Sequence, residues 1–232
     1  MQDNRESTEF DVQPPYLYPQ YKSTVLRSPT RPLMILPEHF SDLSLPVFGE
    51  SAIGPLDHDL TRNARKNAEP LGERIKVSGR VTDEYGRPLD GILIEIWQAN
   101  AAGRYIHREE NHDAPLDPNF LGAGRMLTGA DGKYHFYTVK PGAYPWGNHY
   151  NAWRPNHIHF SVMGHKIGQR LVTQMYFPGD PLFEFDPIFQ AVPVHARELL
   201  IARFRMDWTE PAFALAYEFN IVLKGKNQTP FE

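Results

Sequence analysis

Apolar and polar residues alternate in several short segments from residue 75 onward, which is the pattern of β-strands with one buried face. Turn-forming residues separate these segments, as in DEYGRPLDG at 83–91 and in Asp131-Gly132. Many short strands joined by turns that contain Gly and Pro predict a β-sandwich or a β-barrel. The predicted strands cover residues 75–81, 92–97, 134–138, 157–162, 171–177 and 217–223.

The alternation is absent from residues 1–72, which are rich in Pro, Ser and charged residues. We therefore divide the chain into an N-terminal arm (1–72) and a sandwich domain (73–232). Such an arm either reaches across to a partner chain, as a subunit interface, or wraps its own core. Within the domain we predict long loops at 100–125 and 141–156 and a short helix near 195–205. Long ordered loops at the end of a sandwich are where sites are usually built.

Composition restricts the chemistry of the chain. Its 232 residues include no cysteine, which excludes disulfides, zinc-thiolate sites and cysteine nucleophiles and leaves nitrogen and oxygen as metal ligands. A formal net charge of −4 without a basic run argues against nucleic-acid binding, and no apolar stretch is long enough to span a membrane. The polar start MQDNREST lacks the apolar core of a signal peptide, so we expect a cytoplasmic protein.

A histidine pair stands at the start of one predicted strand. Residues two apart on a strand point to the same face, so His157 and His159 project together while Ile158 points to the core. Two imidazoles placed in this way can bind one metal ion, although the same pattern also occurs in purely structural strands. The loop before the pair is rich in aromatic residues, which fit either a pocket for an aromatic ligand or ordinary core packing: Tyr144, Trp146, Tyr150 and Trp153.

Three sequence blocks carry a resemblance to a known family. They are IWQAN at 96–100 with GRY at 103–105, then PGAYPW at 141–146, then RPNHIHF at 154–160. In this order they resemble the signature of the intradiol ring-cleavage dioxygenases, from about residue 75 to the end of the sequence, and Tyr21-Lys22-Ser23 in the arm matches as well. The resemblance is greatest to the iron-binding β subunits of the branch that cleaves protocatechuate, because the Pro-rich arm is unlike the helical dimerisation segment usual in the catechol-cleaving branch.

The resemblance implies a mononuclear non-haem Fe(III), one per chain, held by Tyr105, Tyr144, His157 and His159. It makes Tyr144 and His159 axial ligands, and Tyr105 and His157 equatorial ligands beside a bound hydroxide. Ferric iron is a hard acceptor that anionic oxygen suits well. A free phenol has a pKa of about 10, but a bound cation removes its proton. Two phenolates and one hydroxide then neutralise Fe(III), so the resting centre tolerates partial burial.

The same charge count gives Tyr144 a second role. A catechol that chelates as a dianion replaces Tyr144 and the hydroxide, and each of these departing bases takes up one proton, so we hypothesise that Tyr144 is an internal base. Arg154 lies just before the histidine pair and cannot lose its charge. It could stabilise the anion that develops on the substrate, and the alternative is an ordinary ion pair.

The resemblance also assigns the substrate pocket. Gln174 is expected to point toward Arg154 as a further catalytic group, and Tyr21 from the arm to receive the carboxylate of the substrate. Trp146 and Ile188 are expected to pack on the substrate ring, although for Ile188 core packing is an equal alternative. We interpret the other histidines as surface or loop residues that bind no metal: His39, His58, His107, His112, His135, His149, His165 and His195.

The implied activity is that of a dioxygenase, which places both atoms of O2 in its product and needs no nucleotide or organic cofactor. In the protocatechuate branch the product is 3-carboxy-cis,cis-muconate, within the β-ketoadipate pathway of aromatic degradation. The iron-bearing chain of this branch pairs with a homologous α subunit that lacks the ligands, and the αβ protomers assemble further. The implied fold is an all-β sandwich of mostly antiparallel strands, of the transthyretin-like type.

Three alternatives are compatible with the residues. Another intradiol dioxygenase, acting on catechol or hydroxyquinol, would not depend on a substrate carboxylate. A non-catalytic transthyretin-like binding module, suggested by the hairpin GRVTDEYGRPLDGILIEIW, would hold no iron. A zinc hydrolase would use the histidine pair with one carboxylate and would not need two tyrosines.

Overall fold

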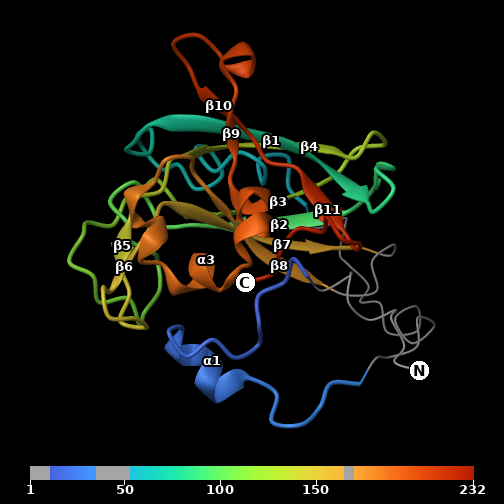
Figure 1. Cartoon of the computed structure of the whole chain (residues 1–232). Coiled ribbons are helices and arrows are strands. Elements are labelled where there is room, and N and C mark those ends of the chain that lie inside the picture. The colour runs from blue at the N-terminus through green and yellow to red at the C-terminus, as the bar shows by residue number, and fades with distance from the viewer. Residues whose placement is uncertain (1–10, 35–52, 165–169) are drawn as a thin grey trace.

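Two sheets form the layers of a β-sandwich in the computed structural model, which describes residues 11–34, 53–164 and 170–232 (Figure 1). The upper layer in this view is a five-stranded sheet built around β1. β4 pairs antiparallel with one edge of β1, and β10 and β11 pair in parallel with successive parts of the other edge. Its strands are β1 (Arg74–Asp83), β4 (Lys133–Val139), β9 (Arg203–Phe204), β10 (Leu215–Glu218) and β11 (Ile221–Leu223).

The predicted strand at 217–223 is two strands in the structure, separated at Phe219 and Asn220. The Phe219 carbonyl lies against Gly79 of β1, where a Cβ atom would overlap it. The same carbonyl accepts a hydrogen bond of 2.6 Å from the Tyr134 hydroxyl. Because Gly79 has no side chain, the chain can break its register there and continue beside β1.

The lower layer is a four-stranded antiparallel sheet in the order β3-β2-β7-β8. β3 was not predicted, and it overlaps the end of the segment 100–125 that we predicted as loop, because its sequence AGRML has no clear alternation. The register places His159 of β7 opposite Trp97 of β2 on one side and Gln174 of β8 on the other. The strands are β2 (Leu93–Trp97), β3 (Ala123–Leu127), β7 (His157–Met163) and β8 (Leu171–Tyr176).

The main core lies between the two sheets, and the alternation seen in the sequence is the reason. Every second residue of the facing strands is buried, and the intervening residues face outward. The all-β sandwich of mostly antiparallel strands is therefore confirmed, with β1–β10 and β1–β11 as parallel exceptions. Fully buried members of the core include Ile75, Val77, Ile94, Phe136, Ile158, Phe160, Val162 and Ile221.

Short helices and a small third sheet lie on the outer side of β7 and β8 (Figure 1). The helix predicted near 195–205 is shorter and is a 3-10 helix, η3, because the chain from Ile201 onward pairs with the sheets again. A second small cluster packs Tyr176 against these helices. These elements are β5 (Tyr144–Pro145), β6 (Trp153–Arg154), η2 (Pro181–Glu184), α3 (Pro187–Ala191) and η3 (Val194–Leu200). A further 3-10 helix, η4 (Met206–Trp208), lies instead beside β10 of the five-stranded sheet.

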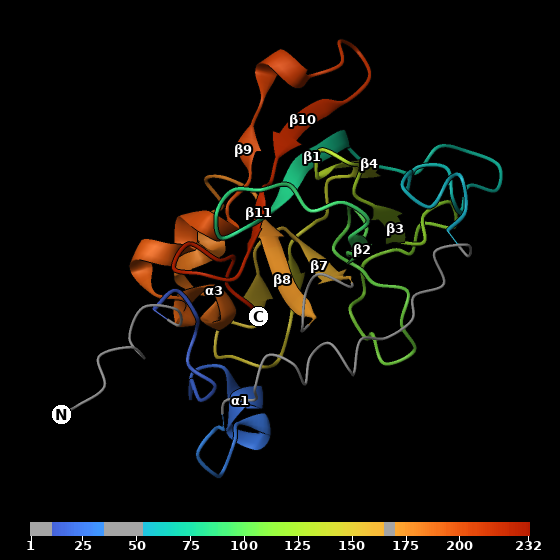
Figure 2. The same ribbon diagram turned by 90° about the vertical axis from the view of Figure 1, so that its right-hand side faces the viewer.

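The described part of the arm, residues 11–34, lies on the far side of the four-stranded sheet from the five-stranded sheet (Figures 1 and 2). It carries α1 (Lys22–Arg27) and contacts its own chain, where the backbone amide of Ser23 donates to the Asn148 side chain. Residues 53–72 belong to the sandwich more closely than we expected, since Leu60 is part of the core. No helix among the described residues is long and apolar enough to cross a membrane.

Candidate metal centre

Strand β7 presents the histidine pair on the outer face of the four-stranded sheet. Ile158 and Phe160 point into the core and are fully buried, while His157 and His159 point the other way, as predicted. The two Nε2 atoms are 3.2 Å apart. The His159 ring stacks on Trp97 with 4.8 Å between ring centroids, which holds the imidazole flat against the neighbouring strand.

The second nitrogen of each ring is anchored away from this point. Nδ1 of His157 lies 2.7 Å from the Pro155 carbonyl, and Nδ1 of His159 lies 3.0 Å from a Glu232 carboxylate oxygen. A carbonyl and an ionised carboxylate can only accept hydrogen bonds, so both rings carry their proton on Nδ1. Both Nε2 lone pairs therefore face the same point, which is the arrangement that a shared cation requires.

His157 strongly resists protonation. Burial, followed by the positive charge of Arg154, holds the pKa of this imidazole well below its ordinary value of 6.5. The nearest guanidinium nitrogen, Nη1 of Arg154, is 3.1 Å from His157 Nε2. A histidine that stays neutral in the acidic range keeps its lone pair for a metal ion.

Two glycines bring the two tyrosines to the same place. Gly103, with φ +79, lies so close to the Ala143 carbonyl that a Cβ atom would overlap it, and a Cβ atom on Gly142 would likewise overlap the Ala101 carbonyl. The loops that carry Tyr105 and Tyr144 consequently pack backbone to backbone. The two rings meet edge to face at 5.2 Å between centroids.

The phenol groups converge on the imidazoles. The Tyr144 hydroxyl is 3.4 Å from His157 Nε2, and the Tyr105 ring is 6.4 Å from the His159 ring. The Tyr105 hydroxyl is buried and has no hydrogen-bond partner among the described residues. Burial, and secondly the neighbouring Tyr144, raise the pKa of Tyr105 well above its ordinary value of 10.0. A buried polar group of this kind needs a compensating ligand, and a cation both binds the oxygen and removes its proton.

This donor set fits a hard trivalent ion. Two phenolic oxygens and two imidazole nitrogens surround one point, and the part of the chain that the structure describes contains no group of three His, Asp or Glu side chains that could hold a metal ion. Phenolate oxygen suits Fe(III) better than it suits Zn²⁺, whose usual ligands are imidazole, thiolate and carboxylate. The geometry therefore fits the ferric site that the sequence predicted better than it fits a zinc hydrolase.

Arg154 lies beside the point where the tyrosines and histidines converge. We considered an ion pair and a role in the site as alternatives for this residue, and the structure shows an ion pair together with contacts to site residues. Its side chain is 2% exposed, and its Nη2 atom is 2.8 Å from the carboxylate of Asp186, which is 0% exposed. The same Nη2 donates to Gln174 Oε1 at 2.7 Å and lies 3.1 Å from the Tyr176 hydroxyl. Nη1 is 3.5 Å from the Tyr144 hydroxyl.

Two acidic residues at this site were missed by the sequence reasoning. Asp186 caps α3, and a local signal existed because an Asp before Pro187 is a common helix start. Glu232 contacts His159, but the two residues are 73 positions apart, so no local sequence pattern could have predicted the contact. Burial alone would raise the pKa of Glu232, but the hydrogen bonds from His159 and Gln174 outweigh it and hold this pKa below its ordinary value of 4.5.

A cavity of about 280 Å³ adjoins the site, between the arm and α3. The arm contributes Tyr21, whose ring lies edge to face with Trp146 at 5.6 Å between centroids. Ile188 is 7% exposed and lines the same cavity, so it is packed in the core and faces the pocket at once. Arg27, which we did not predict, lies at the exposed rim above the Tyr21 ring.

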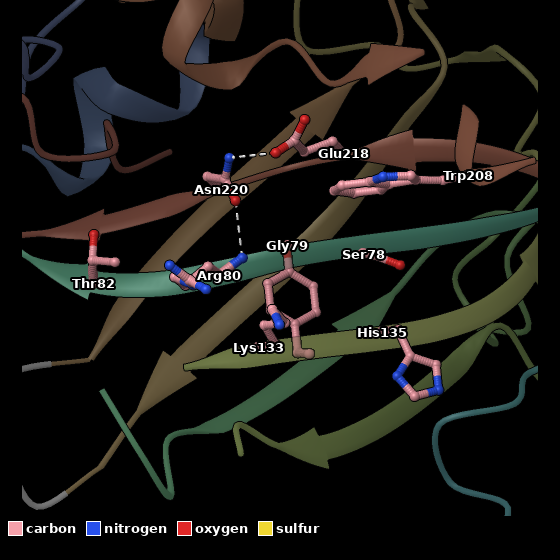
Figure 3. A pocket seen from close by; sticks show the side chains of 10 residues that line it. Ser78, Gly79, Arg80, Thr82, Lys133, His135, Trp208, Glu218 and Asn220 are labelled. Atoms are coloured by element: carbon pink, nitrogen blue, oxygen red, sulfur yellow. Dashed lines mark hydrogen bonds between the residues drawn. The ribbon is translucent and has the colours of Figure 1, made fainter. Parts of the chain in front are cut away.

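A larger hollow of about 560 Å³ lies elsewhere, on the five-stranded sheet (Figure 3). Trp208 and Asn220 lie along one side of β1 there, and Lys133 and His135 along the other. It contains none of the predicted site residues. The smaller cavity is the candidate substrate site because Glu232, which contacts His159, lines it together with Tyr21 and Ile188, although none of the four predicted ligands does.

The histidines that we set aside differ in their exposure. His107, His135 and His195 are exposed, as expected, and His39 and His165 lie outside the described residues. His149 lies in the loop between β5 and β6, as expected of a surface or loop residue, but it is only 4% exposed and packs beside Trp146.

Comparisons with known proteins agree with these observations. The model of a family described as "Dioxygenase" matches residues 43–225, and that of the "Protocatechuate 3,4-dioxygenase beta subunit N terminal" family matches residues 8–39. The chain is 64% identical to a protocatechuate 3,4-dioxygenase beta chain of Burkholderia cepacia, over 94% of this chain and 93% of the relative. It is 29% identical to the alpha chain of that organism's enzyme, over 69% of this chain and 77% of the relative.

Among solved structures, 3-chlorocatechol 1,2-dioxygenase from Rhodococcus opacus 1CP superposes with a TM-score of 0.57 at 22% identity. The match covers 80% of this chain and 76% of that chain. At this identity the likeness concerns the fold, and it places the sandwich described above among known dioxygenase structures.

Proposed function

Because the chain belongs to the intradiol dioxygenase family, we propose that it is the iron-binding β subunit of a protocatechuate 3,4-dioxygenase. Its reaction would be the O2-dependent cleavage of protocatechuate between the two hydroxylated carbons, giving 3-carboxy-cis,cis-muconate. The observation that carries the proposal is the convergence of two phenols and two imidazoles at one buried point. The similarity to the Burkholderia cepacia beta chain supports the choice of substrate.

Four side chains would hold the metal: Tyr105, Tyr144, His157 and His159. When bound, a non-haem ferric ion supplies the Lewis-acidic, redox-active centre at which a catechol and O2 react. The two imidazoles are pre-oriented for this task by the acceptors on their Nδ1 atoms. Tyr105 contributes a hydroxyl that has no other partner among the described residues.

Tyr144 is the residue best placed to move a proton. Its hydroxyl oxygen lies between His157 Nε2, at 3.4 Å, and Arg154 Nη1, at 3.5 Å. The guanidinium stabilises negative charge on this oxygen, and the oxygen can take up a proton from an incoming catechol hydroxyl. In Tyr144→Phe, rapid-mixing absorbance should show slower formation of the substrate dianion, and an unchanged rate would remove this role from Tyr144.

Arg154 and Gln174 would stabilise the charge that develops on the ring during O2 attack. Arg154 keeps its positive charge because the buried carboxylate of Asp186 pairs with it. Gln174 is held by the same guanidinium, so both groups are fixed before the substrate arrives. Fixed charges in a site from which water is excluded stabilise a transition state more than mobile ones do.

The cavity beside these residues suits a flat aromatic acid. Ile188 lines the cavity and offers apolar surface for a ring, and Trp146 packs behind Tyr21 beside it. The phenol of Tyr21 can donate a hydrogen bond to a carboxylate. The guanidinium of Arg27 at the rim adds a positive charge on the same side. These groups favour protocatechuate over catechol or hydroxyquinol, which lack the carboxylate.

We also infer an α-subunit partner, since a homologous alpha chain exists for the related enzyme of Burkholderia cepacia. The described part of the arm supports an interface role, because several large apolar side chains there are exposed: Val25, Leu26, Leu33 and Met34. Residues 11–24 meanwhile pack on their own chain. The arm would thus connect the site of this subunit to a partner.

Oxygen consumption by the purified complex with its α subunit tests the proposed reaction. Protocatechuate should consume one O2 per molecule, and both atoms of ¹⁸O2 should appear in the two carboxylates that ring cleavage creates in the tricarboxylate product. Catechol and hydroxyquinol should react far more slowly. Equal rates with catechol would contradict the assigned substrate, and incorporation of a single labelled atom would contradict the dioxygenase reaction.

A further inference from the structure

The two histidine ligands of the proposed site have different partners behind them. Nδ1 of His157 donates to a neutral acceptor, the Pro155 carbonyl, whereas Nδ1 of His159 donates to the carboxylate of Glu232 at 3.0 Å. A carboxylate behind an imidazole increases the electron density that the ring donates through its other nitrogen. The pair is therefore electronically unequal, although the sequence motif is symmetric.

The position of Glu232 results from several fixed contacts of the segment 229–232. The Glu232 amide donates to the Val172 carbonyl at 3.0 Å, which ties the end of this segment to β8. The Pro230 carbonyl accepts a hydrogen bond of 2.6 Å from the Thr173 hydroxyl. Figure 1 shows this end of the chain, marked C, next to α3 and below β8.

The arm holds the segment from its other side. The Phe231 amide donates to Gln13 Oε1 at 2.8 Å, and the Phe231 ring stacks on Tyr16 at 5.6 Å between centroids. Side-chain freedom at Glu232 is thus restricted from two directions. A carboxylate fixed in this way can orient a neighbouring ring at little further cost in entropy.

The second contact of the carboxylate connects it to the catalytic arginine. Gln174 Nε2 lies 2.5 Å from Glu232 Oε2, and Gln174 Oε1 accepts from Arg154 Nη2 at 2.7 Å. A carboxylate accepts only, so it fixes which end of the Gln174 amide faces Arg154. One oxygen of Glu232 thereby orients both a ligand and a substrate-facing amide.

We propose that Glu232 is a positioning residue of the metal centre, whose carboxylate keeps the His159 proton on Nδ1, turns its Nε2 toward the other ligands and strengthens it as a donor. This inference rests on the proposed iron site. It concerns the metal affinity and the electronic state of that site. Glu232 also lines the cavity proposed for the substrate, but the role inferred here acts through His159.

Three variants test the role. Glu232→Gln keeps the shape and removes the charge, Glu232→Ala removes the group, and Glu184→Gln neutralises an exposed carboxylate as the matched control. Each is purified with the α subunit, and iron content, the rate of iron loss to a chelator and the visible spectrum are measured. Both Glu232 variants should lose iron about 10–100-fold faster than the wild type, with Glu232→Ala the faster, and the control should match the wild type.

The spectrum adds a readout that a merely structural role would not change. A weaker donor at His159 lowers the energy of tyrosinate-to-iron charge transfer, so the band of Glu232→Gln should move to longer wavelength. A residue that only stabilises the fold would lower the unfolding temperature and leave the band in place. If Glu232→Gln keeps the wild-type band and the wild-type rate of iron loss, the proposal is overturned. Glu232→Gln alone is sufficient for this test if Glu232→Ala does not fold.

A measurement on the metal-free protein separates this inference from the proposed function. Long-range ¹H–¹⁵N correlation spectra report which nitrogen of His159 carries the proton. The wild type should show the Nδ1–H form alone, and Glu232→Ala should show a mixture of both forms. A mixture already present in the wild type would overturn the inference even if iron binds, whereas a wild type without iron would overturn the function and leave the tautomer result intact.

Discussion

The hollow on the five-stranded sheet and the candidate metal centre with its neighbouring cavity differ in size and in the state of their polar groups. The hollow on the five-stranded sheet is the larger, at about 560 Å³ against about 280 Å³. Its polar groups satisfy one another at the surface: Asn220 accepts from the Arg80 amide and donates to Glu218 (Figure 3). At the other site, a guanidinium and a carboxylate are fully buried and the Tyr105 hydroxyl has no partner among the described residues.

The difference shows that chemistry, more than volume, identifies a site. Burying charges and leaving a polar atom unpaired both cost free energy, so a fold retains them where a bound group compensates or a reaction uses them. The surface hollow carries no such cost. The same type of substitution should therefore change stability, iron binding and activity far more at the candidate metal centre than in the surface hollow.

The largest contrast should come from histidines. His157→Ala should abolish activity and reduce bound iron to background, because it removes one of four proposed ligands. His135→Ala, in the surface hollow, should retain the wild-type iron content and turnover. Elemental analysis and oxygen consumption measure both, and iron retained in full by His157→Ala would contradict the ligand assignment.

Carboxylates give the next contrast. Asp186→Asn leaves the guanidinium of Arg154 buried without a counter-charge, and we expect the free energy of unfolding to fall by about 3–5 kcal/mol. Glu218→Gln alters a pair near the surface, so its urea midpoint should hardly change. Urea unfolding of both metal-free variants measures the difference, and equal midpoints would show that the Arg154–Asp186 pair is not buried in solution.

Two buried phenols should respond with opposite sign. Tyr134→Phe leaves the Phe219 carbonyl without its donor and should lower the free energy of unfolding by about 1–3 kcal/mol. Tyr105→Phe removes an unpaired hydroxyl and should raise the stability of the metal-free protein, while it weakens iron binding. Thermal unfolding with and without iron measures both; a destabilised metal-free Tyr105→Phe would mean that the hydroxyl has a protein partner.

The smallest expected effect concerns pH. Because the pKa of His157 in the folded protein lies well below its ordinary value of 6.5, the unfolded chain takes up the proton first as the pH falls. The metal-free protein should therefore lose about 1 kcal/mol of stability from this residue between about pH 6.5 and pH 5.5. His157→Gln should lack this loss, and exposed His195→Gln should keep it. A pH-independent difference between His157→Gln and the wild type would contradict the lowered pKa.

Much of the fold was accessible from the sequence because one face of each long strand is buried. The alternation around Ile75, Ile94 and Ile158 reports that burial directly. β3 has no such alternation, and the break between β10 and β11 depends on the contact of Gly79 with Phe219, which no local pattern records. Long-range pairing decides these features, and a single sequence does not encode it in neighbouring residues.

The candidate site shows the same division. His157 and His159 are neighbours on one strand, so strand geometry alone predicts that they project together. Their partners come from distant segments: Asp186 lies 32 positions from Arg154, and Glu232 lies 73 positions from His159. The burial of His149 also escaped prediction, because a loop residue is buried or exposed according to how the loop folds back.

The visible absorption spectrum of the purified protein with its α subunit, recorded before and after anaerobic addition of protocatechuate, tests the ferric tyrosinate centre most directly. We expect a broad band that gives a red-brown colour, from charge transfer between tyrosinate and Fe(III), and a shift of this band when the substrate chelates the iron. A colourless protein with a full complement of zinc would contradict the assignment of Tyr105 and Tyr144 as ligands.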